Sequence, residues 1–565
     1  MFSAFTLSKK SNYSNVQVIS VLNKLSSASG GVTKVSLNRA ALLSSSGFKS
    51  FIATLEYDPE LVASVSELRS DERLAEKVQV LNFFVFYSHV SRLAAAEEFS
   101  LSDAYVSDVA ETVRRRSRYI GLTGMRFNEY FNSEGGVFAQ EIYDAAGCVV
   151  SFQILMSGQK PLVFKTREEA CTAWLEKISG YCESCVLIAD ASTKSEVVAS
   201  VSSDRAHKVL TLHGNHFFPP YSFGSEVKPT PALIIDNMKV CDALVVLTNA
   251  QRTDIEAQFG TSFSIDVIPN SFAGSDVVSE KIRDPKLFVV VSRLEPIKNI
   301  AFIVRAFRQV VDSDPSLKLE IWGHGAQESM LRSLIVRLGL SDNVSLMGYT
   351  TQACEVFSRA RASLTSSISE GFGLSLLESM SVGTPVIACA ANYGPREIVD
   401  SGVDGFLIDD ESGFAEKILQ LAASDQLFLQ LSKGALTKAS KFTPEIVTSQ
   451  WLALIKRMLV GGGKRHIDSS MEFVNTHSTT FGNLFFEAEG ADLGSFSQYR
   501  RVEILRVDRT RMFKETISTV EPGIYRIAKI KYEAEHSRYC LWISQGQRAF
   551  DGVVPKGAIR FRLIA

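Results

Sequence analysis

The sequence predicts an α/β protein with two doubly wound parallel sheets facing each other across a cleft, an inserted antiparallel β subdomain and a C-terminal all-β domain. Three observations support this class. Short apolar strands alternate with helix-sized intervals in two separate parts of the chain. Hairpin patterns broken by "NSEGG" and "DAAG" interrupt the first of these parts. After a flexible "GGGK" linker, residues 465–565 contain only short strands and turns.

The first part opens with the strand "VQVISVL" (Val16–Leu22), a loop that ends in two glycines, the helix "VTKVSLNRAALLSSSG" and the strand "FKSFIATL". Residues 71–118 have a mostly helical pattern, which ends in the basic run "RRRSR" (Arg114–Arg118). Residues 119–157 then predict the inserted hairpins. Strands and helices alternate again from "CVLIAD" through "KVLTLHG" to "ALVVLT".

The second part begins near Lys286 and contains six strands at helix-sized intervals: "KLFVVVSRL", "LKLEIWGHG", "NVSLMGYT", "ASLTSSIS", "TPVIAC" and "DGFLIDD". We divide the chain accordingly into four parts. They are a discontinuous N-terminal α/β unit (1–75 and 176–275), a helical segment with the inserted hairpins (76–175), a second α/β unit (276–460) and the all-β domain (465–565).

Composition places the chain among globular proteins. It has 565 residues, 45% of them hydrophobic and 22% charged, which is enough for several packed cores. The net charge of −2 gives no indication of a nucleic-acid partner. We find neither a signal peptide nor an apolar run long enough to span a membrane. Eight scattered cysteines, some of them in apolar strands, favour a reduced cytosolic protein.

The stretch "SEGFGLSLLE" places two carboxylates, Glu370 and Glu378, on either side of a glycine turn. The pattern predicts a strand, a turn at Gly371–Gly373 and a helix that begins near Leu374. Glu370 then lies at the carboxyl end of a strand, where open α/β sheets bind ligands, and the start of the helix can face an anion. The alternative is a pair of solvated glutamates.

Two cations follow the first strand of the second part. Arg293 and Lys298 lie on either side of a turn in "VVVSRLEPIKN", where they could clamp a diphosphate or form an ordinary surface pair. In the first part, the glycine pair that ends at Gly31 precedes a helix and lets backbone approach an anion. His213 and His216, in "TLHGNHFFPP", lack an evident third metal ligand and could also be core histidines.

Five stretches occur together in a fixed order: "VSRLEPIKN", "IWGHG", "VSLMGYT", "SEGFGLSLLESMSVGTPVIA" and "GPREIVDSGVDGFLI". Across roughly residues 285–410 they resemble the retaining, nucleotide-sugar-dependent glycosyltransferases of family four, which have the GT-B fold. "SGGVTKVSLNRAALL" resembles the N-terminal glycine loop and helix of that family. Together with the hairpins and "CDALVVLTNAQRTDI", the chain resembles more narrowly the subgroup that α-glycosylates wall teichoic acid or serine-rich adhesins. The C-terminal β domain lies outside this resemblance.

The resemblance implies a role for each matched residue. Glu370 would contact the donor sugar near the reacting centre, while Arg293 and Lys298 would stabilise the leaving diphosphate. His213 would approach the transferred sugar, although the choice between it and His216 stays open. The other matched positions would contact the nucleotide sugar: Glu378 the ribose, Gly348 and Tyr349 the base, Gly31 the diphosphate, and Gly371, Phe372, Gly373 and Leu374 the sugar and phosphates.

The resemblance further implies an enzyme: a retaining hexosyltransferase that needs no metal or other cofactor. Its donor would be a UDP-linked hexose or N-acetylhexosamine, such as UDP-glucose or UDP-GlcNAc. Its acceptor would be a polymer such as a poly(polyol phosphate) teichoic acid. Two alternatives stay open: a serine-rich glycoprotein or another glycan or lipid as acceptor, and an inactive glycan-binding or chaperone paralogue. We expect no nucleic-acid partner, a homo-oligomer assembled through residues 119–157, and a cytoplasmic location that includes the inner membrane face.

Overall fold

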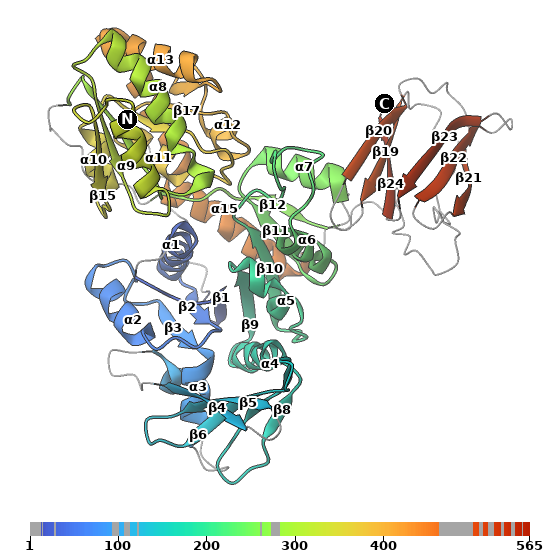
Figure 1. The fold of residues 1–565 in the computed structure, drawn as a ribbon. Coiled ribbons are helices and arrows are strands. Elements are labelled where there is room, and N and C mark those ends of the chain that lie inside the picture. The colour runs from blue at the N-terminus through green and yellow to red at the C-terminus, as the bar shows by residue number, and fades with distance from the viewer. Residues whose placement is uncertain are drawn as a thin grey trace.

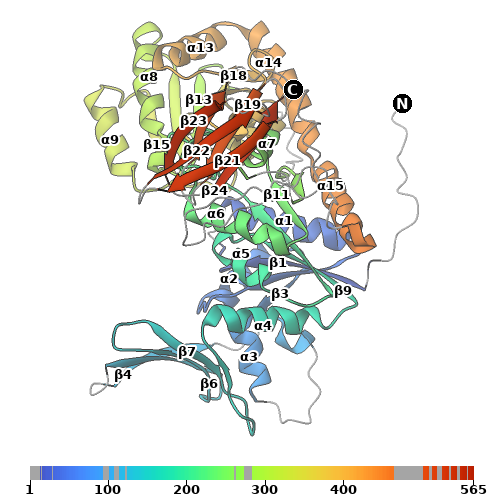
Figure 2. The same ribbon diagram turned by 90° about the vertical axis from the view of Figure 1, so that its right-hand side faces the viewer.

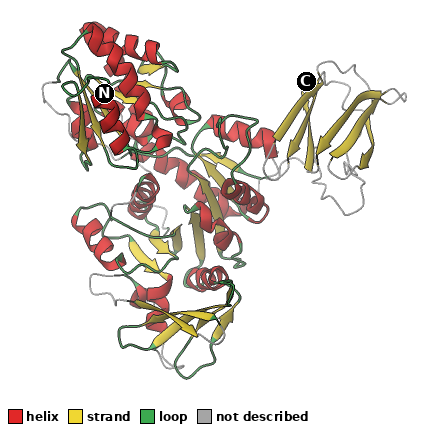
Figure 3. Cartoon of the chain, in the orientation of Figure 1, coloured by secondary structure: helices red, strands yellow, loops and turns green. Residues whose placement is uncertain are grey.

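The computed structural model describes residues 13–462, apart from 14, 28–29, 93–100, 107–112, 121–123, 260–262 and 273–282, together with the backbone of six strands between 501 and 564. Two parallel sheets, each covered by helices, and a five-stranded antiparallel sheet make up the described residues before 463 (Figures 1 and 3). This arrangement confirms the predicted α/β class with an inserted antiparallel sheet.

The first sheet has seven parallel strands in the order β12-β11-β10-β9-β1-β2-β3. Its central strands are apolar on both faces, as expected for a parallel sheet covered on both sides by helices. The strands are β1 (Val16–Leu22), β2 (Lys49–Thr54), β3 (Gln79–Asn82), β9 (Ser184–Ala189), β10 (Ala206–Leu212), β11 (Ala243–Val246) and β12 (Ile265–Val267). The helices around it are α1 (Gly31–Ser45), α2 (Leu61–Ser70), α3 (Phe83–Val90), α4 (Arg167–Ser179), α5 (Ser195–Ala199), α6 (Pro229–Asp236) and α7 (Asn249–Phe259).

The second sheet contains the six predicted strands, all parallel, in the order β15-β14-β13-β16-β17-β18. They are β13 (Leu287–Val291), β14 (Lys318–Trp322), β15 (Val344–Gly348), β16 (Ala362–Thr365), β17 (Val386–Ala388) and β18 (Gly405–Leu407). The helices are α8 (Ile300–Ser313), α9 (Glu328–Arg337), α10 (Ala353–Ser358), α11 (Leu374–Ser381), α12 (Gly394–Ile398), α13 (Glu411–Ala423) and α14 (Asp425–Ala439). β13 and β16 are neighbours, so the loops that follow them are adjacent.

Two elements lie on the first sheet although the sequence assigns them elsewhere. β3, which falls within the segment 76–175, pairs with β2. Helix α15 (Pro444–Arg457), which follows the second unit in the chain, packs Trp451 and Leu454 against Val18 and Val186 of the first sheet. Helix α3 and most of helix α4 also fall within the segment 76–175 and join the core of the first unit, so packing departs from the predicted domain ranges at these elements as well; the ranges stay a proposal.

The inserted sheet contains β4 (Arg114–Ile120), β5 (Met125–Phe131), β6 (Val137–Tyr143), β7 (Val149–Ile154) and β8 (Leu162–Phe164), in consecutive antiparallel order. It lies beyond the first unit, on the side away from the second unit (Figures 1 and 2). Its inner face joins the core of the first unit, where Tyr130 and Phe152 contact Phe83 and Phe84. The insert is therefore an integral part of the first unit's packing.

The predicted helical pattern for residues 71–118 is wrong in two places. β3 occupies part of it, and the basic run Arg114–Arg118 lies in β4, an exposed edge strand rather than the end of a helix. Arg116 and Arg118 both pair with Glu129 on β5, and their guanidinium groups lie over aromatic rings of the same strand. Long-range strand pairing therefore overrides the local pattern.

Beyond residue 500 the structure describes two three-stranded antiparallel sheets, ordered β20-β19-β24 and β21-β22-β23. The strands are β19 (Arg501–Val507), β20 (Met512–Ile517), β21 (Tyr525–Tyr532), β22 (His536–Ile543), β23 (Arg548–Pro555) and β24 (Ala558–Ile564). The predicted strand "FGNLFFEAEG" lies outside the described residues. Within the described part of the chain, none of the helices combines the length and the apolar character that crossing a membrane requires.

Candidate active site

Loops at the carboxyl ends of the two sheets meet through glycine backbones. A Cβ atom added to Gly371 would overlap the carbonyl oxygen of His213, which directly follows β10. A Cβ atom on Gly31, at the start of α1, would lie 3.7 Å from the side chain of Leu374, at the start of α11. Because open α/β sheets bind ligands outside the carboxyl ends of their strands, these contacts bring the predicted residues of both units to one candidate site.

Glu370 and Lys298 form an ion pair at this site. Lys298 ends the short 3-10 turn η4 (Pro296–Lys298) after β13, whereas Glu370 follows β16 on the neighbouring strand. Their side chains are 18% and 20% exposed, and Ser367 Oγ donates to the same carboxylate at 3.3 Å. A carboxylate and an ammonium held in this way can bind a sugar hydroxyl and a phosphate, respectively.

The turn after Glu370 is built so that backbone can approach a ligand. Gly373 has a φ of +98°, which favours glycine, and it begins α11 without a side-chain cap. The first N–H groups of α11 thus have no capping side chain and can bind an anion. The turn is held from behind by the buried Phe372 and by backbone hydrogen bonds of Glu370 to Asn392 (3.0 Å) and Tyr393 (2.6 Å).

Arg293 lies next to this pair. It is exposed and lines an open cleft with a volume of about 460 Å³, together with Tyr221, Glu295, Pro296, Ile297 and Ile368. The cleft adjoins the Lys298–Glu370 pair, because Ile368 donates a backbone hydrogen bond of 2.9 Å to Ile297, the residue before Lys298. Arg293 thus adds a second cation beside the Lys298–Glu370 pair.

Glu378 is occupied by a partner from the other unit. It lies on α11 and forms an ion pair with Lys34, which lies on α1 one turn after Gly31. The Lys34 side chain is 48% exposed and that of Glu378 only 12%. The pair spans the two units at the point where Gly31 faces Leu374, so a ligand that binds the same oxygen of Glu378 competes with Lys34.

Gly348 and Tyr349 lie at the far end of the site, at the carboxyl end of β15. Gly348 has a φ of +83° and accepts a hydrogen bond of 2.7 Å from the backbone of Gly323. The Tyr349 side chain is exposed and stacks on the ring of His324, with centroids 6.5 Å apart. Two exposed rings beside a glycine backbone can hold a planar base.

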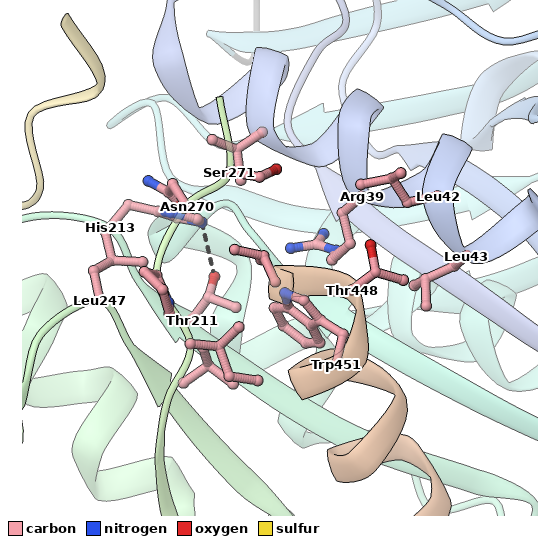
Figure 4. Close-up of a pocket in the computed structure, with 15 residues that line it drawn as sticks. Arg39, Leu42, Leu43, Thr211, His213, Leu247, Asn270, Ser271, Thr448 and Trp451 are labelled. Carbon is pink, nitrogen blue, oxygen red and sulfur yellow. Dashed lines mark hydrogen bonds between the residues drawn. The ribbon is translucent and has the colours of Figure 1, made fainter. Parts of the chain in front are cut away.

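The two candidate histidines have different surroundings. His213 lines a small cavity between α1, β10 and α15, and Figure 4 shows its ring directed toward Thr211. His216 is fully buried, and its ring stacks on Tyr393 with the planes 3° apart. Burial, with a smaller contribution from the charge of Lys228, lowers the pKa of His216 to about 3. His213 thus borders the site, whereas His216 is a neutral core residue.

Sequence reasoning missed the buried polar group behind His213. Asp190 ends the segment "CVLIAD" at the carboxyl end of β9, and this position was the available signal. Its carboxylate pairs with Arg39 of α1 and contacts the imidazole of His213. Burial alone would raise the pKa of Asp190, but the charge of Arg39 and the hydrogen bond to His213 outweigh burial and lower this pKa well below its usual range.

Among the described residues, no group of three or more His, Cys, Asp or Glu side chains is arranged to hold a metal ion. The site thus combines a carboxylate–ammonium pair and an uncapped helix start with a second cation in the adjoining cleft and a histidine whose backbone contacts Gly371. Such groups are suited to a reaction in which an anionic leaving group departs from a hydroxylated ligand.

Comparison with known families identifies the second unit. Residues 275–437, which include Arg293, Lys298, Glu370 and Glu378, match the family model described as "Glycosyl transferases group 1". This part of the chain is a group 1 glycosyltransferase domain. Its six-stranded sheet, the η4 turn and the start of α11 all fall within the matched residues.

The likeness to characterised glycosyltransferases extends well beyond that domain. The poly(ribitol-phosphate) alpha-N-acetylglucosaminyltransferase of Staphylococcus aureus is 23% identical, over 78% of this chain and 99% of that protein. The poly(glycerol-phosphate) alpha-glucosyltransferase of Bacillus subtilis is 25% identical, over 76% of this chain and 73% of that protein. The solved structure of the pneumococcal O-GlcNAc transferase GtfA, in complex with UDP and GlcNAc, has a TM-score of 0.60 at 19% identity, with 79% of this chain and 99% of that chain covered. That structural likeness establishes the GT-B-like fold.

Proposed function

We propose that this glycosyltransferase moves a hexose or N-acetylhexosamine from a UDP-linked donor to a poly(polyol phosphate) acceptor, with retention of the anomeric configuration. The observation that carries the proposal is the Lys298–Glu370 ion pair beside the uncapped start of α11 and the backbone of His213. Two relatives that align over three quarters of this chain or more are named for transfer to poly(ribitol phosphate) and poly(glycerol phosphate).

The chemistry of glycosyl transfer explains why these groups belong together. The transition state separates an oxocarbenium-like sugar from a diphosphate, so the protein must stabilise negative charge on one side and orient the sugar on the other. In our proposal Lys298 moves from Glu370 to the diphosphate, where Arg293 and the amides of α11 add further positive potential. Glu370 is then free to accept a hydrogen bond from a hydroxyl of the transferred sugar.

The remaining contacts follow the length of the donor. Tyr349 and Gly348 hold the base, and Glu378 accepts hydrogen bonds from the two ribose hydroxyls once Lys34 has been displaced. Gly31 faces the diphosphate from the first unit. The other matched positions line the sugar and phosphates, namely Gly371, Phe372, Gly373 and Leu374. Phe372 acts indirectly, because its buried side chain holds the turn in place.

A polymeric acceptor is favoured by the sequence alignments. The poly(ribitol-phosphate) and poly(glycerol-phosphate) transferases align with 76–78% of this chain, whereas the peptide N-acetylglucosaminyltransferase subunits of four Streptococcus species align with 55–71%. The structural comparison is neutral on this point, because GtfA covers 79% of this chain. β4 offers four arginines to an anionic chain, but Arg116 and Arg118 already share Glu129, so Arg114 and Arg115 carry most of the available charge.

Self-association through the insert stays part of the proposal. Both edges of the inserted sheet are exposed: β4 along its whole length, and β8 at Leu162 and Val163. Exposed edge strands pair readily with another chain. Removing the insert would uncover Phe83 and Trp174 in the core, so Val163→Lys is the cleaner test. Light scattering should show a smaller particle for Val163→Lys than for the unaltered protein, and a monomer in both would remove the insert from assembly.

A donor screen followed by an acceptor screen tests the proposed function. A UDP-sugar that binds the folded state must raise the melting temperature, so donors are first ranked by thermal shift. The best donor is then offered with poly(ribitol phosphate), poly(glycerol phosphate) or a serine-rich peptide. Transfer to either polyol phosphate supports the proposal. Transfer to the peptide alone would mean that the acceptor is a serine-rich glycoprotein and not a polyol phosphate polymer. The absence of both donor hydrolysis and transfer would favour an inactive glycan-binding protein.

A further inference from the structure

The hydrogen bonds of His213 fix which of its ring nitrogens carries the proton. Nε2 lies 3.1 Å from Oδ1 of Asp190 and 3.0 Å from Oγ1 of Thr211. The hydroxyl proton of Thr211 is directed to the carbonyl oxygen of Ala189, at 2.7 Å, so Oγ1 is left to accept. Both neighbours of Nε2 are therefore acceptors, and Nε2 must be the protonated nitrogen.

Asp190 is held in place by donors on every other side. Arg39 donates to both carboxylate oxygens, with Nη1 3.1 Å from Oδ1, and Ser36 Oγ donates to Oδ2 at 2.8 Å. Trp451 of α15 lies over the Arg39 guanidinium, 4.7 Å from its centre, and covers the pair from outside. The carboxylate is fully buried, so its orientation is determined by these partners rather than by solvent.

The opposite ring nitrogen of His213 is left as an acceptor. Nδ1 is buried and has no hydrogen-bond partner within the part of the chain that the structure describes. His213 lines a cavity of about 20 Å³ together with Asn270 and Ser271 (Figure 4). A cavity of this size has room for one water molecule. Nδ1 can accordingly accept a hydrogen bond from a water molecule or a ligand hydroxyl that reaches it.

We propose that Asp190 is a positioning residue, which together with Thr211 holds His213 as the Nε2–H tautomer and keeps Nδ1 available as a hydrogen-bond acceptor beside the transferred sugar. This inference rests on the proposed glycosyl transfer for its consequence in catalysis, but the tautomer itself does not depend on that reaction. Arg39 acts one step further back, because it fixes the carboxylate that fixes the imidazole.

An asparagine at position 190 reverses the tautomer. The Oδ2 side receives the shorter hydrogen bonds, from Arg39 Nη2 and Ser36, so we expect the amide oxygen there even though the NH₂ group then meets Arg39 Nη1 on the Oδ1 side. Its NH₂ group then replaces Oδ1 and donates to Nε2 of His213, which must give up its proton. The proton moves to Nδ1, and the acceptor that the wild-type protein presents becomes a donor.

Nitrogen-15 NMR of the histidine rings measures this directly in the full-length protein, with His213 assigned by the loss of its signals in His213→Gln. We expect Nε2–H in the wild-type protein and Nδ1–H in Asp190→Asn. Ser36→Ala is the matched control, since it removes a hydrogen bond to the same carboxylate without touching His213. It should keep Nε2–H. If Asp190→Asn fails to fold, the additional change Arg39→Met removes the repulsion between Nη1 and the NH₂ group, while Ser36 Oγ remains to orient the amide oxygen, so the expected tautomer is the same.

Steady-state kinetics supply the second readout. Asp190→Asn should lower kcat/KM about 10- to 100-fold, the effect of a lost hydrogen bond to a charged group, and Ser36→Ala about threefold at most. An Nδ1–H tautomer in the wild-type protein, or Nε2–H in Asp190→Asn, overturns the assignment. Equal kinetic losses in the two variants would reduce Asp190 to a structural role. The predicted tautomers in a protein without glycosyl transfer would instead refute the proposed function alone.

Discussion

Replacing Lys298 by alanine separates the catalytic role of the ion pair from its structural role. The pair is partly buried, and Ser367 Oγ remains to hydrogen-bond Glu370, so the structural loss is small. We expect the free energy of unfolding to fall by about 1 kcal/mol or less, as for ion pairs that retain contact with solvent. We expect a larger loss in the transition state, because in the proposed mechanism Lys298 stabilises the charge that develops as the diphosphate leaves. Removing one such group costs about 3 kcal/mol, or about 10²-fold in kcat.

The assay is sugar transfer under saturating donor, with thermal unfolding measured on the same samples. Glu370→Gln should lower kcat by a similar factor, because an amide keeps the shape but not the charge of the carboxylate. Lys417→Ala is a suitable control, since it removes a partly exposed lysine that pairs with Glu416 far from the site in the sequence. Near-normal turnover in Lys298→Ala with an intact fold would refute the reasoning and place the leaving-group site elsewhere.

Three further outcomes follow from other parts of the structure. Burial lowers the pKa of His216 to about 3, so the unfolded chain, with its ordinary pKa of about 6.5, binds a proton that the native state excludes. As the pH falls below about 6.5, the free energy of unfolding should therefore decrease by about 1.4 kcal/mol per pH unit. His216→Phe should reduce this slope in thermal unfolding. An unchanged slope would argue against a neutral buried His216. Lys34→Met frees Glu378 and should tighten UDP binding about threefold in calorimetry, whereas weaker binding would make Lys34 a donor ligand. Arg114→Glu should raise KM for the polymer and weaken the salt dependence of this KM. Lys160→Glu, the same charge change in the loop between β7 and β8, should have neither effect. Equal effects of the two changes would exclude a specific contact by β4.

Local sequence patterns predicted most strands of the two parallel sheets but not the strand formed by the basic run Arg114–Arg118. Apolar runs at helix-sized intervals predicted the six strands of the second sheet and five of the seven strands of the first, because such strands are buried on both faces; β3 and β12 were not predicted. The basic run Arg114–Arg118 shows where this approach ends. A block of like charges has no hydrophobic alternation, and it forms β4 because β5 supplies Glu129 and two aromatic rings. These contacts come from strand pairing, which a local pattern does not contain.

The candidate site divides in the same way. Glu370 and Lys298 belong to sequence motifs that follow one another in the order typical of a known family, so they could be selected from the sequence. The structure brings the two side chains together as an ion pair. Asp190 and Arg39 are 151 positions apart, and each is an ordinary residue in its own segment. They meet only because α1 packs on the sheet in which β9 lies beside β1. The choice between His213 and His216 likewise depended on burial, which their spacing of three residues does not encode.

The anomeric configuration of the product, measured by proton NMR with and without a chelator, tests the central claim most directly. In the proposed mechanism Lys298, Arg293 and the start of α11 stabilise the leaving diphosphate, so transfer from an α-linked donor should proceed in chelator and give an α-linked product. Loss of transfer in chelator would mean that a metal ion supplies the charge assigned to these groups. A β-linked product would contradict retention and the proposed arrangement in which Glu370 accepts a hydrogen bond from the transferred sugar.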